Sequence, residues 1–167
     1  MLPNSSEAAW LGIIRIVTGA MWLIHGVQKV LNPQFAGPDG MMAGIIRNSM
    51  THASAPYQHF LTSVVLPNAA LFGHLVAWGE TLTGLSLLLG LFSRLGGLGG
   101  MFLTLNYMLT KGSFGDLNGY AGLDAATFLL SFVNLVLPTG MRFGIDGLLF
   151  GRGARESAKS PPDWAKS

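Results

Sequence analysis

The sequence predicts an all-α integral membrane protein, a four-helix bundle with short interfacial helices in its long first loop and after its last span. The first reason is composition, because 50% of the 167 residues are hydrophobic and only 11% are charged. An average soluble domain has roughly 25% charged residues. The second reason is a positive mean hydropathy of +0.45. The third is a set of apolar stretches long enough to cross the hydrocarbon core of a bilayer.

The composition also excludes several classes of function. The chain contains no cysteine, which removes thiolate metal sites, iron–sulfur clusters and covalently attached haem. The net charge of +2 is small and the basic residues are scattered, so we expect no nucleic-acid partner. The first residues carry no Lys or Arg, and we expect no cleaved signal. Redox chemistry would therefore need a quinone, another non-covalent cofactor or a second subunit.

The first predicted span covers about residues 9–31. A repeating set of small and polar residues falls on one stripe of this helix, so we expect the stripe to face protein rather than lipid. The stripe consists of Arg15, Gly19, Trp22, Gly26 and Lys29. Glycines on such a face allow a neighbouring helix to approach closely. Lys29 either snorkels to the membrane surface or attracts anions toward a cavity.

The connection from residue 32 to 68 is divided by prolines at 33, 38, 56 and 67. Two amphipathic patterns, at residues 41–50 and 57–65, lie between these prolines. Both are typical of short helices that lie on the membrane surface or fold over the end of the bundle. Periodicity alone cannot separate a membrane anchor from a lid, so both roles stay open.

The second predicted span, residues 69–91, has a single carboxylate, Glu80, at its middle. An ionised carboxylate there costs roughly 2.5–3.5 kcal/mol and needs a partner, a water-filled cavity or a proton. We expect Arg15 to be the partner, since the two differ in depth by roughly 8 Å at helical rise, within reach of an Arg side chain. The pair is either a structural clamp, or Arg15 binds an anion or a quinone oxygen while Glu80 relays protons.

The third and fourth predicted spans cover residues 95–110 and 123–137, within a domain of residues 1–150. The GGLGG segment at 96–100 suits close helix contact. A further interfacial helix is expected at 139–150, followed by a polar, disordered tail at 151–167. Asp116 and Asp146 are interpreted as ordinary surface charges.

Basic residues in the connections predict the orientation of the spans. Six lie in the tail and the second loop and three on the opposite side, which places both termini in the cytoplasm. The six are Arg94, Arg142, Arg152, Arg155, Lys159 and Lys166, and the three are Lys29, Arg47 and Lys111.

Depth matching at about 1.5 Å per residue places polar side chains from all four spans in the outer half of the bundle. They are His25, His74, Glu80, Asn106, Tyr107 and Asp124. This pattern is expected of a site that opens outward, with Glu80 and His25 as proton-handling, catalytic residues. The substrate-binding candidates are Arg15, Lys29, His74, Asn106 and Tyr107. His25 and His74 share a depth, but His74 faces about 120° away from Glu80 on its helix, which argues against haem; we expect no metal.

Two motifs carry a family resemblance. They are Arg15-x3-Gly19-x6-Gly26-x2-Lys29 and Gly79-Glu80-x3-Gly84-x2-Leu87-Leu88-Leu89-Gly90-Leu91-x2-Arg94. Over about residues 10–150 the chain resembles the DoxX/DoxD family of small four-helix membrane proteins. The long proline-bearing connection looks closer to the DoxD type, the small subunit of thiosulfate:quinone oxidoreductase.

The resemblance implies a subunit in a prokaryotic cytoplasmic membrane that oxidises thiosulfate to tetrathionate, passes electrons to quinone and works with a second subunit, DoxA. Arg15, Lys29 and Glu80 match the motif positions. A second hypothesis is a non-catalytic accessory or assembly subunit that stabilises a larger membrane complex through its glycine-lined faces. A third is a small carrier for anions or protons, against which the lack of inverted repeats argues.

Overall fold

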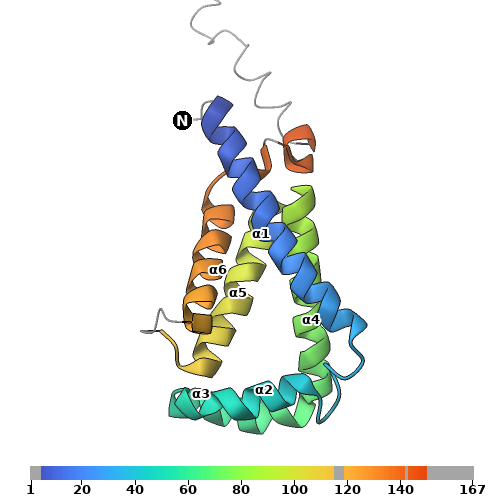
Figure 1. Cartoon of the computed structure of the whole chain (residues 1–167), viewed down its shortest axis with the longest axis vertical. Helices are drawn as coiled ribbons and strands as arrows, with labels where there is room; N and C mark the ends of the chain where they lie inside the picture. The colour runs from blue at the N-terminus through green and yellow to red at the C-terminus, as the bar shows by residue number, and fades with distance from the viewer. Residues whose placement is uncertain (1–4, 115–118, 142, 150–167) are drawn as a thin grey trace, which may run out of the picture.

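The computed structural model describes residues 5–114, 119–141 and 143–149, and within these ranges it contains helices and connections but no strand. The predicted all-α class is therefore confirmed. Four long helices run along the length of the molecule (Figure 1). They are α1 (Ser5–Leu31), α4 (Ala69–Leu89), α5 (Ser93–Lys111) and α6 (Gly119–Val136).

Two helical stretches, Ser6–Leu31 and Ala55–Leu89, are long and apolar enough to cross a membrane, and Gly122–Val136 is a shorter apolar helix. The four long helices occur where the sequence predicts its four spans. That all four cross a bilayer stays a prediction, because length and composition single out only two stretches among the described residues.

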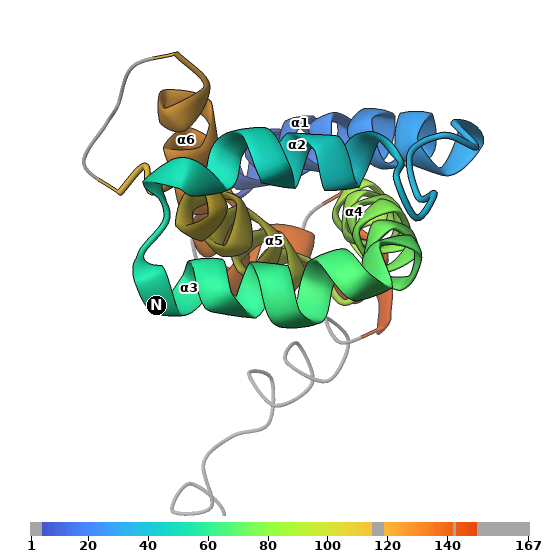
Figure 2. The same cartoon turned by 90° about the horizontal axis from the view of Figure 1, so that it is seen from below.

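Residues 41–68, which we call the end layer, lie across one end of the long helices (Figure 2). Both amphipathic patterns form helices, as predicted. The second pattern continues through a π-helical and a 3₁₀ turn and bends into α4 next to Pro67, which has no backbone N–H to donate. The elements of the layer are α2 (Met41–Ser49), η1 (Met50–His52), α3 (Ala55–Phe60), η2 (Leu61–Val65) and η3 (Leu66–Asn68).

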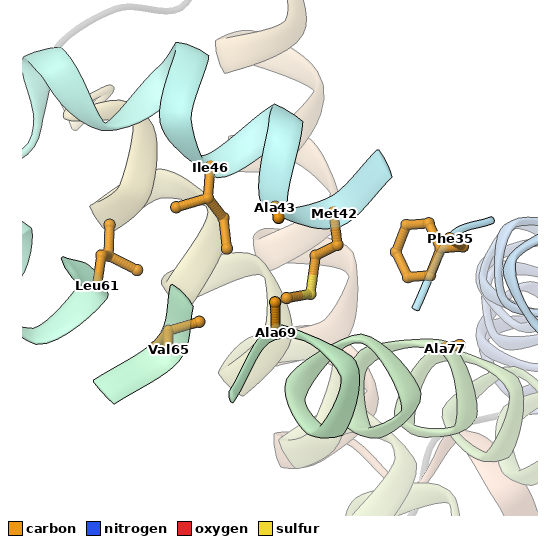
Figure 3. Packing of buried hydrophobic residues seen from close by; sticks show 8 residues of the cluster. All are labelled: Phe35, Met42, Ala43, Ile46, Leu61, Val65, Ala69 and Ala77. Carbon is orange, nitrogen blue, oxygen red and sulfur yellow. The ribbon is translucent and has the colours of Figure 1, made fainter. Parts of the chain in front are cut away.

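A buried apolar cluster joins the end layer to α4 (Figure 3). Its members are Phe35, Met42, Ala43, Ile46, Leu61, Val65, Ala69 and Ala77. The opposite faces of the layer keep Met41, Ile45, Phe60 and Val64 exposed. One face of each amphipathic segment is thus used to hold the layer against the bundle, because burial of apolar area stabilises that contact.

The helices α1 and α4 pack in antiparallel fashion through the predicted small-residue stripe. A Cβ at Gly26 would lie 2.6 Å from Thr81 Oγ1, which leaves no room for a side chain. The facing pairs are Gly19 with Leu88, Leu23 with Gly84, and Gly26 with Thr81. Because the helices are antiparallel, the residue number rises along α1 as it falls along α4, and each of these pairs adds up to 107. The same register places Glu80 level with Val27 of α1.

The GGLGG segment makes the close helix contact that the sequence predicts, and its partners are α6 and α1. A Cβ at Gly97 would lie 2.6 Å from the Leu135 nitrogen, and one at Gly100 would lie 2.5 Å from Ser131 Oγ. The buried Trp22 of α1 donates a hydrogen bond of 3.4 Å to the same Ser131 hydroxyl. Glycine in this segment therefore lets three helices meet around one indole ring.

Replacing Gly26 with Ala should push α1 away from α4 and lower the free energy of unfolding by about 1–3 kcal/mol, because overpacking a close contact costs that much. Chemical denaturation in detergent micelles, followed by circular dichroism, measures the change. The matched control is Gly44→Ala in α2, where a Cβ meets nothing within 4 Å. That control should be neutral or stabilise by up to about 1 kcal/mol, since Ala is the better helix former.

Candidate functional site

Glu80 is buried in the bundle, with 1% of the residue exposed. Its Oε1 atom forms an ion pair with the Lys29 ammonium of α1. The same oxygen accepts a hydrogen bond of 2.5 Å from the Tyr107 hydroxyl of α5. These three residues, which we call the Glu80 cluster, neutralise the carboxylate from inside the bundle.

Lys29 lies between the buried carboxylate and the surface. Its side chain is 26% exposed. Its ammonium lies 5.5 Å from the centre of the Phe35 ring and 5.6 Å from the centre of the Tyr107 ring, close enough for a cation–π attraction. Lys29 therefore neither snorkels away from the bundle nor attracts anions with an unpaired charge, because Glu80 already pairs with it.

The other carboxylate oxygen, Glu80 Oε2, is buried and has no hydrogen-bond partner among the described residues. Buried polar atoms nearly always have a partner, so each exception calls for an explanation. A proton on Oε2 or a hydrogen-bond donor on a bound molecule would satisfy this atom. The site can therefore hold a proton, or accept a hydrogen bond from a hydroxyl group, in an apolar setting.

The predicted pairing of Arg15 with Glu80 is wrong. Arg15 is fully buried and donates hydrogen bonds to four backbone carbonyl oxygens, two at the C-terminal end of α4 and two in the segment after α6. The acceptors are Leu87 O, Leu88 O at 3.0 Å, Thr139 O at 3.2 Å and Phe143 O at 2.8 Å. The last carbonyls of a helix have no partner within it, and Arg15 satisfies two of them at the end of α4.

The helix register explains why Arg15 cannot reach the carboxylate. Arg15 precedes Val27, the residue level with Glu80, by twelve residues, or about 18 Å at helical rise. Lys29 is only two residues from that level. Lys29, near the end of α1, therefore pairs with Glu80, and Arg15, near the middle of α1, does not.

Asp146 is not an ordinary surface charge, contrary to our expectation. Its carboxylate accepts hydrogen bonds from the backbone nitrogens of Phe92 at 2.7 Å and Ser93 at 2.9 Å, and from the Ser93 hydroxyl at 2.6 Å. Two free N–H groups at the start of α5 are thereby satisfied, and the negative charge suits a helix N-terminus. Asp116 lies outside the described residues.

The other predicted site residues divide into two groups. His25 on α1 and His74 on α4 are exposed, and the structure does not bring them into the Glu80 cluster. Asn106 is next to Tyr107 in sequence, but it accepts a hydrogen bond of 2.9 Å from Tyr57 of α3. Asn106 therefore connects α5 to the end layer, and Lys29, Glu80 and Tyr107 are the predicted residues that meet.

A second ion pair, not predicted from the sequence, lies near this site. Lys111 of α5 binds Asp124 of α6 at 2.7 Å. Lys111 follows Tyr107 by four residues, so the two side chains share one face of α5. That spacing is visible in the sequence, but the partner on another helix is not.

The fold and the buried cluster define a small, apolar, all-helical protein with an ionic site inside its helix bundle. A family profile described as "TQO small subunit DoxD" matches residues 10–160. The chain belongs to the DoxD family, which is membrane-associated, and the description as a small subunit implies a partner subunit. Comparison with curated proteins and with solved structures gave no significant match.

The donor and acceptor groups of the cluster are of the kinds that a quinone would need. The two carbonyl oxygens of a quinone need hydrogen-bond donors, and the hydroxyls of the reduced form need acceptors. The Lys29 ammonium has further N–H groups besides the one that binds Glu80, whereas the single O–H of Tyr107 is already bonded to Glu80 Oε1. Glu80 Oε2 is a buried acceptor without a partner among the described residues, and Phe35 and Ala77 supply buried apolar surface. No group of three or more His, Cys, Asp or Glu suited to a metal occurs in the described part of the chain.

Proposed function

We propose that this chain is the membrane subunit of a quinone-linked oxidoreductase that oxidises thiosulfate to tetrathionate, with a second subunit. Family membership supports the class of reaction. The observation that carries the proposal for this chain is the Glu80 cluster, a buried carboxylate with one paired oxygen and one oxygen lacking a partner among the described residues. Ionisable groups buried inside membrane proteins are typical of functional sites.

In this proposal α1, α4, α5 and α6 cross the bilayer, with both termini in the cytoplasm and the end layer outside. The two apolar stretches support two of these crossings. The beginning of α1 and the helical turn at residues 145–149 lie at the same end, opposite the end layer (Figure 1). An even number of crossings requires this arrangement.

The stoichiometry of the reaction explains why a proton-handling residue is needed. Two thiosulfate ions give one tetrathionate and two electrons, and they release no proton. A quinone supplies the electron acceptor, and it takes up two electrons together with two protons. Glu80 is placed to hold such a proton inside the bundle, while Lys29 and Tyr107 stabilise the carboxylate after the proton leaves.

We assign proton handling, and not anion capture, to the residues described here. Lys29 is paired with Glu80, and Arg15 is completely buried and bonded to backbone carbonyls. Neither predicted anion-binding residue offers an unpaired cation to thiosulfate. The thiosulfate step is therefore proposed to involve the partner subunit.

The accessory-subunit hypothesis depends on glycine-lined faces that remain available to a partner. Gly19, Gly26 and Gly84 are already in contact with backbone of the facing helix, and Gly97 and Gly100 contact α6. These glycines serve the packing of this chain, so this observation does not favour the accessory function.

Replacing Tyr107 with Phe should lower the rate of thiosulfate-dependent quinone reduction about tenfold or more, because the hydroxyl that stabilises the Glu80 carboxylate is lost. Membranes containing this chain and its partner subunit, given thiosulfate and a short-chain quinone, provide the assay. The control is Tyr57→Phe, which removes the hydroxyl bonded to Asn106 and should have a smaller effect. Absence of turnover with any sulfur donor in the unsubstituted protein would contradict the proposed function.

A further inference from the structure

Two exposed phenylalanines lie at the end of the molecule opposite the end layer (Figure 1). Phe92 is in the turn between α4 and α5, Phe143 follows α6, and the two residues are 54% and 63% exposed. Both have a positive φ, of 52° and 57°, and they are the two residues other than glycine with a positive φ in the described part of the chain. A bulky L residue rarely adopts this left-handed conformation. Surrounding contacts must enforce it, and such residues often occur at functional positions.

Two charged side chains hold these phenylalanines in place. The Asp146 carboxylate accepts a hydrogen bond of 2.7 Å from the Phe92 nitrogen, and the Arg15 guanidinium donates one of 2.8 Å to the Phe143 oxygen. The Asp146 nitrogen also donates to the Gly90 oxygen at 2.8 Å. Phe92 and Asp146 are 54 positions apart in the sequence, so these contacts join two distant segments into one surface.

Exposed leucines extend this surface. Leu95 is in the first turn of α5, and Leu148 and Leu149 are in the helical turn after α6. We call the set of five exposed residues Phe92, Leu95, Phe143, Leu148 and Leu149 the terminal face. Large apolar side chains gathered on an exposed surface mark a site of contact with a membrane or another protein.

The terminal face continues the exposed apolar side of α4. Leu82, Leu85 and Leu89 are exposed and share one side of that helix, which belongs to a stretch long and apolar enough to cross a membrane. Phe92 comes three residues after Leu89. Exposed apolar residues therefore continue along the chain from the side of α4 into the terminal face, so we infer that this face borders the bilayer and not open water.

Basic residues accompany the terminal face along the chain. Arg94 lies between Phe92 and Leu95 and is exposed. The segments 91–94 and 138–167 together contain six Lys or Arg residues and three Asp or Glu residues. One of these three acids, Asp146, is already engaged with backbone N–H groups. Phe and Leu beside an excess of basic residues are typical of segments that lie in the interface of an anionic bilayer.

We propose that the terminal face lies in the interfacial region of the bilayer and binds anionic phospholipids. Its phenylalanines and leucines contact the acyl chains, and Arg94 contacts the headgroup phosphates. Arg15 and Asp146 are positioning residues, because they fix the two segments that form the face. The inference rests on the proposed crossing of the bilayer by α4 and α5, and it does not depend on thiosulfate or quinone.

A soluble partner subunit is the competing occupant of the terminal face. Such a partner could cover the same leucines, but it would not reach the exposed leucines of α4 within the acyl chains, so continuity with α4 favours lipid. Collisions with two small reagents separate the two occupants. Oxygen dissolves in acyl chains and a nickel chelate stays in water, whereas a protein contact excludes both reagents.

The chain contains no cysteine, so a single introduced cysteine carries a nitroxide spin label at one known position. Leu95→Cys and Leu148→Cys report on the terminal face. Phe102→Cys reports on the exposed side of α5, and Asp39→Cys reports on water, since the Asp39 side chain is 85% exposed. In nanodiscs of phosphatidylcholine and phosphatidylglycerol, electron paramagnetic resonance should show that both terminal-face labels collide more often with oxygen than with nickel. They should match the Phe102→Cys label and not the Asp39→Cys label.

Anionic lipid should strengthen this attachment. Nickel collisions of the Leu148→Cys label should rise in nanodiscs of phosphatidylcholine alone. Adding Arg94→Gln in the mixed nanodiscs should raise them about two- to fivefold, because one basic residue near an anionic surface strengthens binding by up to about fivefold. The matched control is Arg47→Gln, which removes an exposed basic residue of α2 at the other end of the molecule and should leave the collisions unchanged.

Three outcomes would overturn the proposal. Nickel collisions at Leu148→Cys as frequent as at Asp39→Cys in the mixed nanodiscs would show that the terminal face is in water. Equal collisions with and without phosphatidylglycerol would show that it does not recognise anionic lipid. Shielding of the labels from both reagents would show a protein contact. Leu149→Cys replaces either terminal-face variant if circular dichroism shows that it does not fold.

Discussion

Arg15→Met should lower the free energy of unfolding by about 2 kcal/mol or more. Methionine retains an unbranched apolar side chain but removes the Arg15 donors to the carbonyl oxygens of Leu87, Leu88, Thr139 and Phe143. Leu87 O keeps a bond of 3.2 Å from the Gly90 nitrogen. Each buried acceptor left without a partner costs about 1–3 kcal/mol. The loss should loosen the contact between the segment after α6 and the α4–α5 turn, which then depends on the bonds of Asp146 to Phe92 and Ser93.

Denaturant-induced unfolding in detergent micelles measures this effect. Arg47→Met is the matched control, because Arg47 pairs with Asp39 on the surface at 3.0 Å and an exposed pair contributes about 0–1 kcal/mol. An Arg15→Met protein as stable as the Arg47→Met protein would show that the four carbonyl contacts do not stabilise the fold.

Glu80→Gln should lower thiosulfate-dependent quinone reduction by about 10²–10⁴-fold, the range expected when a general acid–base residue is lost. The amide keeps an oxygen that can accept from Tyr107, but it has no proton to exchange at this position. Lys29 loses its counter-ion, and its partial exposure allows the ammonium to reach water. The substitution should therefore affect turnover far more than stability.

Initial rates with a short-chain quinone, measured beside the melting temperature, separate these effects. Glu80→Asp should have an intermediate rate, because it keeps the carboxyl group on a shorter side chain. Asp39→Asn, which removes an exposed carboxylate, should retain the full rate. If Glu80→Gln kept more than half of the activity, the Glu80 cluster would be a helix clamp and not a proton-handling site.

The sequence was sufficient to predict the features that depend on local pattern. The four long helices, the two short amphipathic segments and the glycine faces all occur where predicted, since each follows from spacing within a single segment. The need of Glu80 for an internal partner was also predictable, because it follows from the energy of a buried charge.

The identity of that partner was not predictable, because it depends on the register between two helices. The sequence-based depths are counted from the outer ends of the two predicted spans, which places Leu31 level with Ala69. The glycine contacts in the structure place Leu31 level with Val76 instead. This shift of seven residues corresponds to about 10 Å at helical rise. It moves Glu80 away from Arg15 and toward Lys29. The Lys111–Asp124 pair and the cap formed by Asp146 also join separate segments, so no local pattern predicts them.

Two donors from different helices converge on a single atom, Glu80 Oε1, while its twin atom has no donor among the described residues. The terminal torsion of a glutamate is broad and nearly two-fold symmetric. A half-turn of the ionised carboxylate therefore exchanges the two oxygens and restores the same contacts. The two oxygens of Glu80 are thus interchangeable while every helix backbone stays still.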